Sequence, residues 1–191
     1  MRHPGPMIII AALSALALSA SPRSHAESPL AAGSTVYLPL IAKAPLSIQT
    51  PEEEAMALAV VALVNSERAA AGCAPLTVND HLVAAAQGQS RDMAVYDFVS
   101  HTNPDPSRAT LSQRATAAGY SWSLLGENVA AGQKTSAAVM SSWMSSGGHR
   151  DNILRCAYTE IGVGYYRQAD DTFPGGSWGY QHYWTQVFGR P

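Results

Sequence analysis

Two runs decide the fold of this chain: Ile161-Gly162-Val163-Gly164-Tyr165-Tyr166 and His182-Tyr183-Trp184-Thr185-Gln186-Val187-Phe188. Both are rich in β-branched and aromatic residues, and Pro174-Gly175-Gly176 lies between them, which is typical of two β-strands joined by a loop. The sequence upstream has the apolar spacing of helices instead. Helices first and strands mostly later predict an α+β fold in which helices pack on a mainly antiparallel sheet.

Four helices and one more strand are expected before these runs. Pro51 and the three glutamates after it favour a helix N-terminus, because acidic side chains interact well with that end of the helix dipole. The predicted helices run from Pro51 to Ala70, from a cap at Asp80 to Tyr96, from Leu111 to Ala118 with Gly119 closing it, and from Thr135 to Met144. Leu124 to Ala130, around Glu127, is the further short strand.

The N-terminus has the features of a secretory signal. Arg2 and His3 precede an apolar run from Met7 to Ala20, and Ser24-His25-Ala26 offers small residues at the positions that a signal peptidase reads. The alternative is a membrane anchor, but the run is shorter than the roughly 20 residues that cross a bilayer. We therefore predict a signal peptide at residues 1–26, a secreted protein and no transmembrane span after cleavage.

The mature chain divides into a linker and one domain. Residues 27–54 are rich in Pro, Ser and Ala and form the predicted linker, which includes the apolar piece Val36-Tyr37-Leu38-Pro39-Leu40-Ile41. Residues 55–191 show no internal repeat and form the predicted domain. The 12 Lys and Arg residues nearly balance the 14 Asp and Glu residues, and no basic tract occurs. This balance argues against nucleic acid as a partner.

The chain has two cysteines, Cys73 and Cys156. After export they meet an oxidising environment, where a pair of thiols tends to form a disulfide, and two cysteines allow one pairing. Two separate buried thiols are the alternative, because a bridge makes strict geometric demands.

Three short polar motifs carry the candidate chemistry. They are Ser100-His101-Thr102-Asn103-Pro104, Gly126-Glu127-Asn128 and Gly147-Gly148-His149-Arg150-Asp151-Asn152. Imidazole nitrogens and a carboxylate oxygen are good ligands for zinc, and three protein ligands leave a fourth position open to water. The spacing differs from the His-Glu-x-x-His of helical zinc proteases, so the fold must assemble any site that contains His101, Glu127 and His149.

In this order, followed by Glu160-Ile161-Gly162-Val163-Gly164 and the run from Tyr183 to Val187, these motifs resemble the secreted CAP superfamily (cysteine-rich secretory proteins, antigen 5, pathogenesis-related 1), whose domain is also called SCP. The resemblance spans about Leu58 to Gly189. It is strongest to the compact bacterial members, because the cysteine-rich C-terminal extensions of animal members are absent. It implies a three-layer α-β-α sandwich.

The resemblance also implies a central cavity lined by two histidines and two acidic residues. His101, His149 and Glu127 match three of these positions and imply a divalent metal, zinc above all, as cofactor. At the fourth position, where many members carry glutamate, this chain has Ser146. Family members bind sterols, fatty acids or other apolar molecules, so an apolar cleft is expected; Met93, Val139 and Met140 either line it or belong to the core.

The preferred function is a non-catalytic extracellular binding module, with no catalytic residue assigned. One alternative is a metal-dependent peptidase or esterase with Glu127 as ligand or general base. Another uses Ser100 or Ser146 as nucleophile beside a histidine, but the chain lacks a Gly-x-Ser-x-Gly elbow. A third is a structural domain that contacts the cell envelope or a host surface through exposed aromatic side chains. The candidates for those contacts are Trp122, Trp178, Tyr180 and Tyr120. Glu160 and His182 are expected to be structural.

Overall fold

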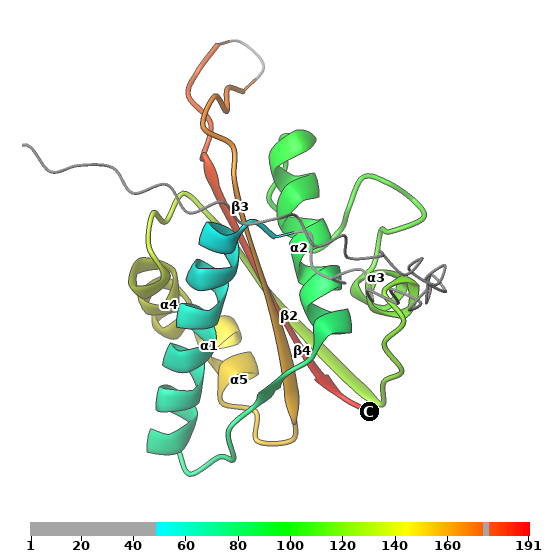
Figure 1. Ribbon diagram of the computed structural model, residues 1–191, viewed down its shortest axis with the longest axis vertical. Coiled ribbons are helices and arrows are strands. Elements are labelled where there is room, and N and C mark those ends of the chain that lie inside the picture. Colours follow the sequence, from blue (N-terminus) through cyan, green and yellow to red (C-terminus); the bar gives the residue numbers. More distant parts are fainter. Residues whose placement is uncertain (1–48, 174–175) are drawn as a thin grey trace, which may run out of the picture. The chain divides into compact units, whose positions relative to one another are not determined.

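The computed structural model describes residues 49–173 and 176–191. The predicted signal peptide and residues 27–48 of the predicted linker lie outside these residues. In chain order the elements are α1 (Pro51–Ala70), β1 (Thr77–Val78), α2 (Asp80–Val95), α3 (Leu111–Ala117), β2 (Leu124–Ala131), α4 (Ser136–Ser145), α5 (Gly147–Ile153), β3 (Glu160–Arg167) and β4 (His182–Arg190) (Figure 1). No helix of the described part is both long and apolar enough to cross a membrane.

The four strands form one mixed sheet in the order β1-β3-β4-β2. β4 lies in the middle and pairs antiparallel with both β3 and β2, while the two-residue β1 pairs parallel with β3. The prediction of a mainly antiparallel sheet is therefore confirmed, with one short parallel pair at the edge. The register places Glu127 of β2 opposite Val187 of β4.

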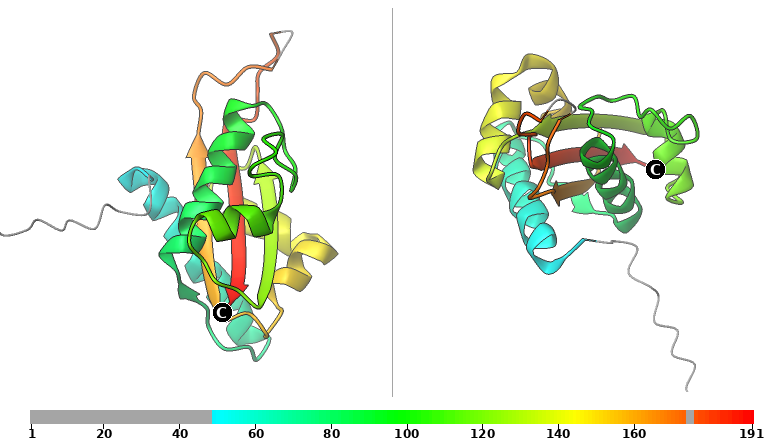
Figure 2. Two further views of the ribbon diagram at one scale, coloured as in Figure 1. Left: turned by 90° about the vertical axis from the view of Figure 1, so that its right-hand side faces the viewer. Right: turned by 90° about the horizontal axis from the view of Figure 1, so that it is seen from above.

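Helices cover both faces of the sheet. α2 and α3 lie on one face, and α1, α4 and α5 lie on the other (Figure 2). The larger apolar cluster lies under α1, α4 and α5, and its largest fully buried side chains are Trp143, Trp184 and Tyr158. Two smaller clusters lie under α2 and α3. This arrangement confirms the three-layer sandwich.

Two glycines of β3 allow α2 to lie very close to the sheet. A Cβ atom at Gly162 would overlap the backbone of Leu82 and Val83, and one at Gly164 would overlap the backbone of Ala86. Only glycine permits such close approach of two backbones. Because Gly162 and Gly164 have no side chains, two consecutive turns of α2 can pack directly against the backbone of β3.

Capping side chains fix where the helices begin. Thr50 and Glu53 form a reciprocal capping box at the start of α1, so the helix begins at Pro51 as predicted and includes residues 51–54 of the predicted linker. α2 is capped by Asn79 rather than by the predicted Asp80, which is its first residue. Thr135 caps α4.

α5 and β1 are not among the elements predicted from the sequence. α5 begins with Gly147 and Gly148, two poor helix formers. β1 has only two residues, both exposed, so it has no apolar alternation that a pattern could reveal.

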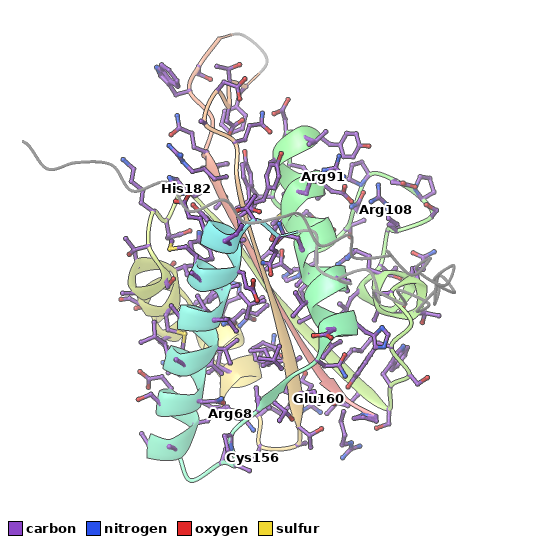
Figure 3. All side chains as sticks on the ribbon, in the orientation of Figure 1. Arg68, Arg91, Arg108, Cys156, Glu160 and His182 are labelled. Carbon is purple, nitrogen blue, oxygen red and sulfur yellow. A yellow bond between two sulfur atoms is a disulfide. The ribbon has the colours of Figure 1, made fainter. Side chains whose placement is uncertain are left out.

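The predicted disulfide joins Cys73 to Cys156, with their Cα atoms 5.0 Å apart. Arg68 of α1 holds the same end of the domain, where Figure 3 places it near Cys156. Arg68 is fully buried and donates hydrogen bonds to backbone carbonyl oxygens of Ala74, Ile153, Arg155 and Tyr158. Such bonds satisfy a buried guanidinium without a carboxylate partner.

Candidate functional site

Glu127 and His101 form the centre of the site. Glu127 lies on β2, and its side chain is only 3% exposed. His101 lies in the loop after α2, and its side chain is 58% exposed. The Nδ1 atom of His101 lies 2.9 Å from Oε1 of Glu127. The strand thus holds a buried carboxylate under an accessible imidazole, and the bond fixes the orientation of the ring.

Arg114 of α3 occupies the other carboxylate oxygen. Its Nη2 atom donates to Oε2 of Glu127 at 2.6 Å and to the backbone carbonyl of His101 at 3.3 Å. Its Nη1 atom donates to the carbonyl oxygens of Arg108 and Ala109. The Arg114 side chain is also only 3% exposed. One buried guanidinium therefore neutralises Glu127 and holds both ends of the loop that carries His101.

A second polar group attaches this loop to α2. Asn103 donates from Nδ2 to Oδ2 of Asp92 at 2.8 Å and to Oε1 of Gln89 at 3.1 Å. Gln89 in turn donates to the carbonyl of Ser100 at 2.8 Å. Arg108 pairs with the same Asp92 at 2.9 Å. The residues on both sides of His101 are thereby fixed to the helix.

His149 enters the site from α5 and is half-buried. Two asparagines join α5 to β2: Asn152 donates to the carbonyl of Glu127 at 3.0 Å, and Asn128 donates to the carbonyl of His149 at 3.0 Å. The imidazole of His149 makes no hydrogen bond within the described chain. Asn128 and Asn152 thus have a structural role, because their hydrogen bonds position His149 beside β2.

The two imidazoles have opposite pKa shifts. The hydrogen bond to Glu127 raises the pKa of His101 above its ordinary value, although burial and the charge of Arg114 act against it. Burial lowers the pKa of His149, and the positive charge of His101 lowers it further. As pH falls, His101 therefore gains a proton before His149 does.

A single three-ligand metal site is not assembled in this arrangement. No group of three His, Cys, Asp or Glu side chains within residues 49–173 and 176–191 lies close enough to hold one ion. Both oxygens of Glu127 are already engaged, one by His101 and one by Arg114. The structure brings His101 and Glu127 into contact and places His149 within electrostatic reach of His101. Zinc binding stays a prediction.

The serine alternative gains no support. Oγ of Ser100 accepts a hydrogen bond from the backbone amide of Thr102, and Ser146 lies half-buried between α4 and α5. In the part of the chain that the structure describes, no serine hydroxyl is hydrogen-bonded to a histidine. The serine–histidine pair that this alternative requires is therefore not formed among the described residues.

The remaining candidates divide between core and surface. His182 is bonded through Nδ1 to the hydroxyl of Tyr165, and Glu160 accepts from Tyr120, so both are structural as predicted. Tyr120 is buried and is no surface contact. The exposed aromatic residues of the predicted set are Trp122, Trp178 and Tyr180, and the core contains Met93, Val139 and Met140.

Arg114 is not among the site residues predicted from the sequence. It lies three residues after Leu111 and beside the buried Ala115, on the inward face of α3. An arginine at an inward position of a short helix needs a buried partner. The inward position of Arg114 in the helix pattern could therefore have indicated a buried polar partner.

Comparison with known proteins identifies the family of this chain. The model of the CAP family, described as the cysteine-rich secretory protein family, matches residues 61–188. The chain belongs to the CAP family. That stretch includes all the site residues described above, from Gln89 to Asn152.

Several bacterial proteins are similar to this CAP domain. The uncharacterised protein YkwD of Bacillus subtilis is 38% identical over 122 residues, which cover 64% of this chain and 45% of that protein. A crystal structure of an extracellular SCP-domain protein from Bacillus anthracis superposes with a TM-score of 0.63 at 28% identity, covering 75% of this chain and 44% of the other. An outer surface protein of Borrelia burgdorferi has the same fold, with a TM-score of 0.61 at 19% identity over 75% and 96% of the two chains. The chain thus spans less than half of the two Bacillus relatives.

Proposed function

We propose that this CAP domain is a non-catalytic extracellular binding module that holds a divalent metal ion, zinc above all, between the imidazoles of His101 and His149. The observation that carries the proposal is the full engagement of Glu127 by His101 and Arg114. A carboxylate bonded to one ring nitrogen of a histidine fixes the ring and raises the basicity of the other nitrogen. Glu127 then acts as the orienting partner of a ligand, not as a ligand.

The same engagement favours binding over hydrolysis. A general base needs a carboxylate oxygen within reach of the water that it activates. Oε2 of Glu127 is hydrogen-bonded to Arg114 at 2.6 Å, and Oε1 is hydrogen-bonded to His101 at 2.9 Å. Neither oxygen is therefore free to activate a water molecule.

Ser146 stands where many family members have an acidic residue. Two imidazoles without that residue would give a weak site, since zinc sites commonly have three or four protein ligands.

Export is supported by the disulfide, because such bridges persist mainly in oxidising compartments. The N-terminal signal pattern and the printed description of the similar B. anthracis protein as extracellular support it too.

Sterols, fatty acids or other apolar molecules remain the proposed organic ligands. A surface hollow of about 360 Å³ between α1 and α4, lined in part by Leu63, Met140 and Met144, offers them apolar contacts. A cell-envelope or host-surface partner remains the alternative, supported by the 73% exposure of Trp178.

Zinc titration by calorimetry tests the metal site. The unaltered protein should bind about one ion per chain, and His101→Ala and His149→Ala should each abolish binding. His81→Ala is the matched control, because His81 contacts the carbonyl of Ala118 and lies outside the site. Ser146→Glu should bind more tightly, since it restores an acidic group beside His149.

The heat of zinc binding should also decrease as pH falls through the pKa of His101, because a protonated imidazole cannot bind a metal. Absence of binding in the unaltered protein, with all variants folded, would assign the histidines to loop structure. Binding that survives both histidine changes would place the ion elsewhere.

A further inference from the structure

The hydrogen bonds that hold His149 continue into the central strand of the sheet. Asn128 of β2 lies opposite Gln186 of β4 in the register, and its Nδ2 atom donates to Oε1 of Gln186 at 3.0 Å. The same Nδ2 atom donates to the backbone carbonyl oxygen of His149 at 3.0 Å. Asn128 therefore joins the backbone of His149 to a side chain in the middle of the sheet.

These hydrogen bonds determine which way both side-chain amides point. A backbone carbonyl oxygen can only accept, so the Asn128 atom that faces the carbonyl of His149 must be Nδ2. Oδ1 of Asn128 accepts from Nδ2 of Asn152 at 3.0 Å. Gln186 must then present its oxygen to Asn128. Its Nε2 atom is left buried, without a hydrogen-bond partner among the described residues.

Gln186 is an unfavourable residue at this position if only stability matters. It is 0% exposed, and Trp184 and Phe188, two residues before and after it on the same face of β4, belong to the larger apolar cluster. A buried donor without a partner destabilises a fold, and such donors are rare. A methionine has a similar length and no unpaired donor. The hydrogen bond to Asn128 therefore explains the glutamine better than core packing does.

This hydrogen bond acts on one of the two imidazoles only. Successive residues of a strand face opposite sides of the sheet, so Glu127 contacts His101 on one face while Asn128 contacts α5 on the other. Glu127 orients the ring of His101 directly. The imidazole of His149 makes no hydrogen bond within the described chain, so its position depends on the backbone of α5.

We propose that Gln186 is a positioning residue for His149, which it holds through the side chain of Asn128, and that it lowers the stability of the fold in doing so. Outer residues of this kind orient metal ligands and tune the affinity of a site. The effect on metal binding rests on the proposed function, whereas the effect on the position of His149 does not. A residue of the central strand, two hydrogen bonds away from His149, then controls one half of the site.

Two substitutions of Gln186 separate positioning from stability. Gln186→Met removes the acceptor for Asn128 together with the unpaired donor, so its urea midpoint should equal or exceed that of the unaltered protein. It should bind zinc about three- to tenfold more weakly, as the loss of about one hydrogen bond predicts. Gln186→Glu keeps an oxygen for Asn128 but buries an ionisable group, so it should lower the urea midpoint and retain the zinc affinity.

Thr185→Val is the matched control on the same strand. Thr185 is fully buried, and its hydroxyl accepts a hydrogen bond from Ser90 on the α2 side of the sheet. Its substitution therefore also removes one buried hydrogen bond, but not one that leads to His149. Thr185→Val should lower the urea midpoint and leave the zinc affinity unchanged.

The mobility of His149 is measured without zinc, by ¹³C relaxation of the ring carbons in the metal-free protein. Gln186→Met should increase the mobility of the His149 ring and leave that of the His101 ring unchanged. If the unaltered protein binds no zinc, the proposed function fails, and this measurement still decides the role of Gln186.

Unchanged mobility of the His149 ring in Gln186→Met would overturn the proposal, and so would an equal change at His101. A Gln186→Met protein that does not fold, or whose urea midpoint falls as far as that of Thr185→Val, would overturn it as well, because the amide would then serve stability. Loss of zinc affinity in folded Gln186→Glu equal to that in Gln186→Met would show that the oxygen facing Asn128 is not what matters.

Discussion

At the scale of single residues, His101 and Arg114 both contact the carboxylate of Glu127. The charges of Glu127 and Arg114 therefore both affect the pKa of His101. Replacing Glu127 by Gln removes the main cause of the raised pKa of His101 and should lower that pKa. Replacing Arg114 by Met removes a positive charge that opposes protonation and should raise it further. The pKa of His101 is measured by NMR titration of its ring protons in the three proteins.

The sign of the pH dependence follows from the same pair. Because the folded-state pKa of His101 is raised, its contribution to stability is fully present below the unfolded-state pKa. That contribution is lost as pH rises through the folded-state pKa. His149 supplies the control: in His101→Ala its pKa should rise, because a positive neighbour is gone. If both variants of the carboxylate pair moved the pKa of His101 in the same direction, the shared carboxylate would not be what sets it.

Arg114 and Glu127 should also stabilise the fold as a unit. Both side chains are 3% exposed, and Nη2 lies 2.6 Å from Oε2. Removing one partner leaves a buried charge alone, which costs about 3–5 kcal/mol. Arg114→Met and Glu127→Gln should each lower the free energy of unfolding by about this amount, whereas the double variant should lose much less than the sum. Urea denaturation of the four proteins measures the cycle. Additive losses would show that the pair is not coupled.

At the scale of elements, two glycines in and under α2 should respond in opposite ways. Gly88→Ala adds a methyl group in open space within a helix and should stabilise the protein by about 0.5–1 kcal/mol. Gly164→Ala forces a methyl group into the backbone of α2 at Ala86 and Gln87, and should destabilise it by about 1–3 kcal/mol or more. The free energy of unfolding in urea measures both. A destabilising Gly88→Ala would mean that neighbouring atoms occupy this space in solution.

The elements also show what sequence patterns can and cannot reveal. α1 and α4 were predicted to within a residue or two, because their apolar spacing and capping residues are local. α5 begins at two glycines, and packing beneath β2 stabilises it, so its local sequence does not indicate a helix. β1 exists only through its pairing with β3, about 80 residues away along the chain.

The candidate site divides in the same way. Short motifs were enough to select His101, Glu127 and His149. Their mutual geometry depends on the loop after α2, on α3 and on α5, which meet only in the folded domain. For that reason Arg114, which occupies the second oxygen of Glu127, was not predicted from the sequence, and the role of Glu127 as a metal ligand stays a prediction.

At the scale of the whole molecule, one covalent bond and one buried arginine close the same long loop. Cys73 and Cys156 are 83 residues apart in sequence, and their bridge encloses β1, α2, α3, β2, α4 and α5. In the chain-entropy model such a loop constrains the unfolded state by about 4–5 kcal/mol. The double variant Cys73→Ser/Cys156→Ser should lose about that much stability and should show a larger denaturant slope, because its unfolded state is more expanded.

Arg68 should allow the double cysteine variant to fold. Its bonds to Ala74 on one side and to Ile153, Arg155 and Tyr158 on the other hold the two ends of the loop together without the bridge. We therefore expect the double cysteine variant to keep its native spectrum at low temperature. Adding Arg68→Met should abolish cooperative unfolding, because both closures are then gone. A cysteine variant with unchanged midpoint and slope would show that the unfolded chain remains closed at this end by other contacts, and the entropic account of the bridge would fail.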